Sequence, residues 1–171
     1  MPFAARLAPR ATLLGVRGRS AEEGVLRWFR RFSATTFDQA DIKFEAAAFA
    51  AFVDGAIRGY RLAPEKLAFL GYSNGANLLA AAMLLHPPLA RHAILLRYSM
   101  VLEAPQEADL SGCRILMIEG RDDPSATDLP GLATVLSACS ATVTALTVSA
   151  GHELSDDDLR VAREVTETWF G

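Results

Sequence analysis

The clearest indication of the fold class is the stretch Leu67-Ala68-Phe69-Leu70-Gly71-Tyr72-Ser73-Asn74-Gly75-Ala76. A short apolar run, typical of a buried strand, leads into a Gly-x-Ser-x-Gly turn, and a helix-like run follows the turn. Glycines two positions before and after the serine let neighbouring backbone approach without a Cβ clash, so the serine can occupy a very tight, strained turn. This context predicts that Ser73 is a nucleophile at the carboxyl end of a strand. The plainer alternative is a strand–helix turn that happens to contain two glycines.

Strand-like and helix-like runs alternate on both sides of this turn, which predicts a mostly parallel sheet between layers of helices. Most of the predicted strands are continuous apolar runs, as expected for strands covered on both faces of a sheet. The predicted strands are Thr12–Val16, Leu67–Leu70, Ala93–Leu96, Ile115–Glu119 and Val143–Val148. The predicted helices are Asp41–Ile57, Gly75–Leu85, Gly131–Ala138 and Ser155–Phe170.

The ends of the first helix and the segment before it carry their own signals. Asp38 or Asp41 is expected to cap the helix Asp41–Ile57, and Gly59 is expected to end it. Residues 17–37 are rich in arginine and aromatic side chains and have no clean periodicity. We expect them to form a surface loop or a small cap within a single domain that spans residues 1–171.

The composition fits a globular protein and excludes several other classes. Of the 171 residues, 51% are hydrophobic and 22% are charged, and the formal net charge is −3. An acidic balance argues against a nucleic-acid binder, and no apolar run reaches the roughly 18–20 residues that a membrane span needs. Cys113 and Cys139 are expected to be reduced, buried thiols. With no export signal, this predicts a cytoplasmic protein.

A serine nucleophile needs a base, and only three histidines are available. His86 ends a predicted helix, and His92 opens a strand at the end of the sheet away from Ser73. His152 follows the last predicted strand, at the same sheet edge as Ser73. The sequence therefore predicts that His152 is the base, although a loop histidine beside a glycine is often merely exposed.

A carboxylate should orient the imidazole and stabilise its protonated form. Asp122 and Asp123 follow the strand Ile115–Glu119, again at its carboxyl end, and both remain candidates at this point. The alternative is a solvated acidic turn, because Asp-Pro is common in turns. The three aspartates 156–158 are poorer candidates, since they lie in the first turn of a helix, whose dipole favours acidic side chains.

Together, several motifs resemble the bacterial phospholipase/carboxylesterase family of α/β-hydrolases, which is related to acyl-protein thioesterases and dienelactone hydrolase. They are Gly71-Tyr72-Ser73-Asn74-Gly75-Ala76-Asn77, Leu84-Leu85-His86-Pro87, Gly120-Arg121-Asp122-Asp123-Pro124 and Gly151-His152. The stretch from Arg17 to Phe32 resembles the Arg- and aromatic-rich loop of the esterase members. The order serine, acid, histidine is that of α/β-hydrolases. The resemblance covers nearly the whole chain from about Leu7.

The resemblance implies a three-layer α/β-hydrolase fold and a serine carboxylic-ester hydrolase that works through an acyl-enzyme. Its G-x-x-D-P motif selects Asp123 over Asp122 as the acid, beside Ser73 and His152, and the N–H of Asn74 is the implied oxyanion donor. No metal or organic cofactor is implied, because no cluster of ligands and no phosphate loop is present. The implied partner is a small ester or thioester, with no nucleic acid and no membrane span, and the sequence allows a homodimer. A thioesterase with the same triad, and a catalytically inactive homologue or fragment, are the alternatives.

One departure from the family concerns the start of the chain. Family members begin with a strand that ends in a His-Gly-x-Gly-Gly-like loop, which supplies a second oxyanion donor, and the sequence begins after that point. The resemblance therefore implies an N-terminally truncated sheet that is poorly soluble and nearly inactive without the missing strand. Either Thr12–Val16 pairs directly with Leu67–Leu70, or the position between them stays empty or is filled by another chain; we expect the second arrangement.

Overall fold

The computed structural model describes residues 2–21, 24, 26–33, 35–104, 107–124 and 130–170. Its centre is a parallel sheet of four strands that lie side by side in the order in which they occur in the chain. The strands are β1 (Phe69–Tyr72), β2 (His92–Leu96), β3 (Arg114–Gly120) and β4 (Thr142–Val148). The prediction of a parallel sheet is thus confirmed, and β1 begins two residues later than expected because its ladder with β2 starts at Phe69, opposite Ala93.

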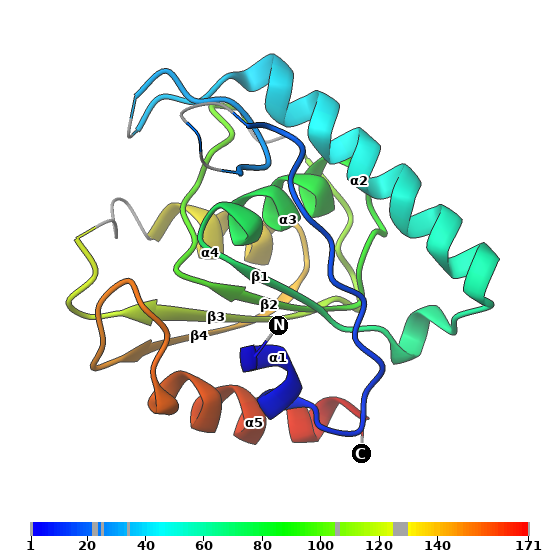
Figure 1. Ribbon diagram of the computed structural model, residues 1–171, viewed down its shortest axis with the longest axis vertical. Helices are drawn as coiled ribbons and strands as arrows, with labels where there is room; N and C mark the ends of the chain where they lie inside the picture. The colour runs from blue at the N-terminus through cyan, green and yellow to red at the C-terminus, as the bar shows by residue number, and fades with distance from the viewer. Residues whose placement is uncertain are drawn as a thin grey trace.

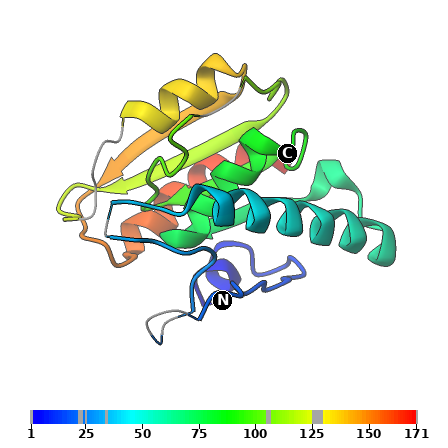
Figure 2. The ribbon, with the colours of Figure 1, turned by 90° about the horizontal axis from the view of Figure 1, so that it is seen from above.

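Helices cover both faces of the sheet, as Figure 1 shows. One face carries α2 (Gln39–Tyr60), α3 (Asn74–Leu85) and α4 (Pro130–Ala138), which follow one another across the sheet when it is seen from above (Figure 2). The other face carries α1 (Pro2–Leu7) and α5 (Asp156–Phe170). Side chains alternate along β2 between these two layers, since Ala93 and Leu95 belong to the core on the α3 side and Ile94 and Leu96 to the core on the α5 side.

The long helix α2 begins two residues before the predicted start and ends three residues after the predicted end, at Tyr60. Asp38 caps its N-terminus by accepting hydrogen bonds from the N–H groups of Ala40 and Asp41, both at 3.1 Å. Gly59 does not end it. The helix continues to Tyr60 and stops at Arg61, which adopts a left-handed conformation with φ of 53°.

Residues 12–16 do not form the predicted strand. They have no regular secondary structure, and Leu13, Leu14 and Val16 are exposed. The apolar pattern was strand-like, but a strand also needs a neighbour to complete its hydrogen bonds, and this segment has no ladder partner among the described residues. Nor does it pair with β1, which in the described part of the chain has a strand only on its β2 side.

The segment from residue 17 to residue 37 is irregular where it is described, apart from isolated bridges that pair Ser20 with Arg27 and Arg31 with Phe37. Phe29 anchors it in the core with 1% of its surface exposed, whereas Phe32 is 71% exposed. The Arg19 guanidinium donates two hydrogen bonds, at 3.0 and 3.1 Å, to the carboxylate of Glu45 on α2. The described residues of the segment 17–37 therefore pack against the helical layer on the α3 side of the sheet.

Candidate active site

Ser73 lies in the turn between β1 and α3 in a backbone conformation that L-residues rarely adopt. Its φ is 52° and its ψ is −123°. The turn closes tightly, because a Cβ on Gly71 would lie 2.6 Å from Cα and 2.7 Å from N of Ala76. The Ser73 N–H donates to the carbonyl of Leu96 at the end of β2, at 2.8 Å, so the neighbouring strand holds the strained residue in place.

Replacing Gly71 with alanine is expected to lower the free energy of unfolding by about 1–3 kcal/mol, because the added methyl group must displace backbone. Chemical denaturation followed by circular dichroism measures this change. Gly55→Ala is the matched control, since an added Cβ there meets nothing within 4 Å and the residue lies inside α2. That variant should be neutral or more stable by up to about 1 kcal/mol. Equal stabilities of the two variants would contradict the packing argument.

The structure brings Ser73, His152 and Asp123 together. His152 Nε2 lies 3.0 Å from Ser73 Oγ, and His152 Nδ1 lies 2.8 Å from Asp123 Oδ2. Because an ionised carboxylate can only accept, Nδ1 donates to Asp123, which leaves Nε2 to accept the hydrogen bond of the serine hydroxyl. The Asp123 side chain is 3% exposed and that of His152 is 35% exposed, so the carboxylate is shielded while the imidazole reaches solvent.

The loops that carry the acid and the histidine are bonded to each other. The N–H of Asp122 donates to the carbonyl of Ala150 at 3.0 Å, and that of Arg121 donates to Val148 at 2.9 Å. Asp122 itself is exposed, whereas Asp123 points inward to the imidazole. The motif resemblance selects Asp123 rather than Asp122, and in the structure Asp123 is the aspartate whose side chain contacts His152.

The other two histidines lie away from this cluster. His86 caps the C-terminus of α3, and its N–H donates to Ala82. His92 opens β2 at the opposite end of the sheet, where its Nδ1 is 3.3 Å from the carbonyl of Leu67 and its ring packs against Trp169 and Phe170. Burial lowers the pKa of His92 below its ordinary value, which disfavours the protonated ring.

Known proteins share this architecture over almost all of the chain. A carboxylesterase from Mesorhizobium loti has a crystal structure with a TM-score of 0.93 at 43% identity, with 97% of this chain and 80% of that chain covered. The chain belongs to the carboxylesterases of the α/β-hydrolase superfamily. The Bacillus cereus carboxylesterase has the same TM-score at 29% identity, with 99% of this chain and 81% of that chain covered. MhqD from Bacillus subtilis strain 168, an inferred hydrolase, is 29% identical over 158 residues, which are 91% of this chain and 79% of MhqD. No protein-family model matches the chain.

The family and the α/β-hydrolase fold predicted from the motifs are therefore confirmed. The chain is an enzyme of the hydrolase type. Asn74 is the first residue of α3, so its N–H is among the groups that have no acceptor within the helix. The Oδ1 atom of the Asn74 side chain accepts a hydrogen bond from the backbone N–H of Trp28 at 2.6 Å.

Trp28 packs against the turn that contains Ser73 and Gly75. Its Nε1 lies 3.3 Å from the position that a Cβ on Gly75 would take, so the second glycine of the motif leaves room for the indole. The ring also packs edge-on against Phe49 of α2, with centroids 5.6 Å apart. The aromatic loop thus contacts both the turn and the longest helix.

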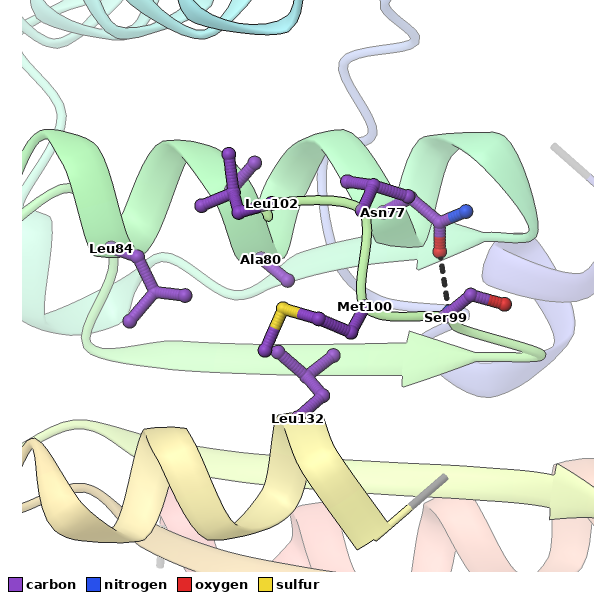
Figure 3. Close-up of a pocket in the computed structure, with 9 residues that line it drawn as sticks. Asn77, Ala80, Leu84, Ser99, Met100, Leu102 and Leu132 are labelled. Carbon is purple, nitrogen blue, oxygen red and sulfur yellow. Dashed lines mark hydrogen bonds between the residues drawn. The ribbon is translucent and has the colours of Figure 1, made fainter. Parts of the chain in front are cut away.

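The loop that follows β2 is fixed to α3 by a buried amide. Asn77 Oδ1 accepts from the N–H of Ser99 at 2.7 Å, as Figure 3 shows. Met100 of the same loop points toward Leu132 of α4, and Leu102 lines the same hollow on the side of α3. The side chains leave no room there for a water molecule, so this hollow is packing rather than a substrate site.

Sequence reasoning missed two residues that contact the histidine loop. Arg97, the residue after β2, and Tyr72, the residue before Ser73, both donate to backbone carbonyls of residues 151–153. Arg97 pairs with Asp158, a contact that the sequence did not predict. The one available signal was a charged residue directly after the apolar run that ends at Leu96.

The described residues contain no group of three or more His, Cys, Asp or Glu side chains that could hold a metal ion. Among their helices, none is both long and apolar enough to cross a membrane.

Proposed function

We propose that the chain hydrolyses carboxylic esters of small molecules through Ser73, His152 and Asp123, with an acyl-enzyme intermediate. The observation that carries the proposal is the continuous chain of two hydrogen bonds, 3.0 and 2.8 Å long, from Ser73 Oγ through the imidazole to Asp123. The esterase activity of the relatives supports the same reaction class.

In the first half of the reaction, Ser73 Oγ attacks the acyl carbon while His152 Nε2 takes the hydroxyl proton. Asp123 keeps the proton of Nδ1 in place and stabilises the imidazolium that forms. The carbonyl oxygen becomes an oxyanion, and the N–H of Asn74 at the N-terminus of α3 donates to it. Collapse of this intermediate breaks the ester bond, and the imidazolium returns its proton to the leaving alcohol.

In the second half, water replaces the alcohol. His152 Nε2 removes a proton from the water as it attacks the acyl-serine, and the same oxyanion donor acts again. The carboxylic acid leaves, and Ser73 recovers its proton from the imidazolium. The strained turn that holds Ser73 serves both halves, because it presents Oγ at the N-terminus of the helix and within reach of the imidazole.

A fluorophosphonate probe tests the nucleophile directly. We expect it to label Ser73 in the purified protein, because such probes react with serines that a neighbouring base activates, and we expect Ser73→Ala to remove the label. Ser137→Ala, at an exposed serine on α4, is the control and should label like the wild type. Labelling that persists in Ser73→Ala would overturn the proposal.

A further inference from the structure

The backbone carbonyl groups of three consecutive residues, 151–153, accept hydrogen bonds from the side chains of Arg97 and Tyr72. Arg97 Nε–H donates to the carbonyl of Gly151 at 2.7 Å, and Arg97 Nη2–H donates to that of Glu153 at 3.2 Å. Between them, the hydroxyl of Tyr72 donates to the carbonyl of His152 at 3.0 Å. The backbone is thus fixed before, at and after His152.

Arg97 is built into the sheet rather than attached to its surface. It follows β2 directly, its N–H donates to the carbonyl of Ile118 on β3 at 3.0 Å, and its φ is 51°. Its side chain is completely buried. A guanidinium presents its donors in a rigid planar fork, so one side chain can reach two carbonyls and a carboxylate at once.

The partner of this guanidinium is Asp158 on α5. Its two carboxylate oxygens accept from Arg97 at 2.7 and 2.9 Å, and Oδ2 also accepts from the N–H and the hydroxyl of Ser155, at 2.7 and 2.8 Å. Burial alone raises the pKa of Asp158, but the hydrogen bonds from Arg97 and Ser155 and the charge of Arg97 outweigh it and hold the pKa below its ordinary value. The ionised form of Asp158 is therefore favoured.

A buried ion pair is a poor source of stability, because the loss of hydration offsets most of the attraction, and well-packed apolar residues can often replace it. What apolar residues could not replace here is the donation to the carbonyls of Gly151 and Glu153. We propose that Arg97, held by Asp158, is a positioning residue that places the imidazole of His152 against Ser73. Tyr72 completes the arrangement from β1.

This inference rests on the proposed function, because the position of the His152 imidazole affects the rate only if His152 is the base. The distance from Nε2 to Ser73 Oγ is 3.0 Å, which is already hydrogen-bond length. A misplacement of about 1 Å in a catalytic group can cost about 10²-fold in rate. A loop freed from its side-chain donors can easily move by that amount.

The decisive variant is the double substitution Arg97→Met with Asp158→Leu, which removes both charges and leaves apolar side chains in their place. We expect kcat for a p-nitrophenyl ester to fall by about 10²-fold, with KM near that of the wild type. The variant should still unfold cooperatively, at a somewhat lower melting temperature, because Ser155 loses its acceptor at the start of α5. The low-field proton resonance of the hydrogen bond between His152 Nδ1 and Asp123 should broaden or disappear. Arg160→Met is the matched control, since Arg160 pairs with Asp157 and Glu164 on the exposed side of α5 and should keep full activity.

A folded double variant with the kcat of the wild type would overturn the inference. If the double variant does not fold, Arg97→Lys decides: lysine keeps a charge for Asp158 but lacks the planar fork, so a reduced kcat supports the inference and an unchanged one overturns it. The proposed function fails in a different way, since the wild type would then not be labelled at Ser73. The proton resonance would still report whether Arg97 positions His152.

Discussion

Replacing His152 with alanine is expected to lower kcat for a p-nitrophenyl ester by about 10⁶-fold, the loss that removal of the histidine causes in subtilisin. The physical reason is that Ser73 then keeps its proton and cannot attack. His152 Nε2 is the proposed base, and it lies 3.0 Å from Ser73 Oγ. Steady-state hydrolysis with the background rate subtracted measures the effect, and labelling by the fluorophosphonate probe should fall with it.

His86→Ala is the control for this variant, because His86 lies at the far end of α3 from Ser73. It should retain the activity of the wild type. If the His152 variant instead keeps its turnover while the Ser73 variant loses it, another group must act as the base.

Replacing Asp123 with asparagine should lower kcat by about 10⁴-fold, as the same change does in trypsin. Asp123 Oδ2 accepts the proton of His152 Nδ1 at 2.8 Å, and the side chain is 3% exposed, so water cannot take over its role. An amide at this place can offer the ring an N–H instead of an acceptor. The imidazole then holds its proton on Nε2, where it cannot take one from the serine.

Asp122→Asn separates this effect from a general loss of negative charge in the loop. Asp122 is exposed, and its contact with the histidine loop is made by the backbone N–H, which the substitution keeps. Its kcat should stay near that of the wild type. A larger loss at position 122 than at position 123 would show that the acid had been assigned one residue too late.

The sheet and the three clustered residues were predictable because local patterns encode them. Buried parallel strands are apolar, so β2 and the middle of β3 appear in the sequence to within a residue. The edge strand β4 is mostly exposed, and its valines and threonines mark it instead. The turn around Ser73 needs glycines at fixed positions, and these are visible without a structure. Asp123 and His152 each follow a strand, and the carboxyl ends of parallel strands share one edge of the sheet.

What the sequence could not provide depends on contacts between distant segments. Thr12–Val16 has the composition of a strand, but pairing decides whether a strand forms, and composition does not report pairing. The spacing of Ser155 and Asp158 resembles a helix-capping box, which the hydrogen bonds between them confirm, but nothing in the sequence links Asp158 to Arg97. Only the fold shows that Asp158 is buried against Arg97, whereas Asp156 pairs with Arg6 on the surface.

The order of the strands has a consequence for how the protein reaches its active form. Each strand pairs with the next one along the chain, so the sheet can grow from β1 to β4 by successive local additions. Ser73 follows β1, Asp123 follows β3 and His152 follows β4, so the three groups meet only after β4 is in place. In a refolding experiment, the return of ester turnover should therefore mark the docking of β4, whereas circular dichroism also reports helices and strands that form before it.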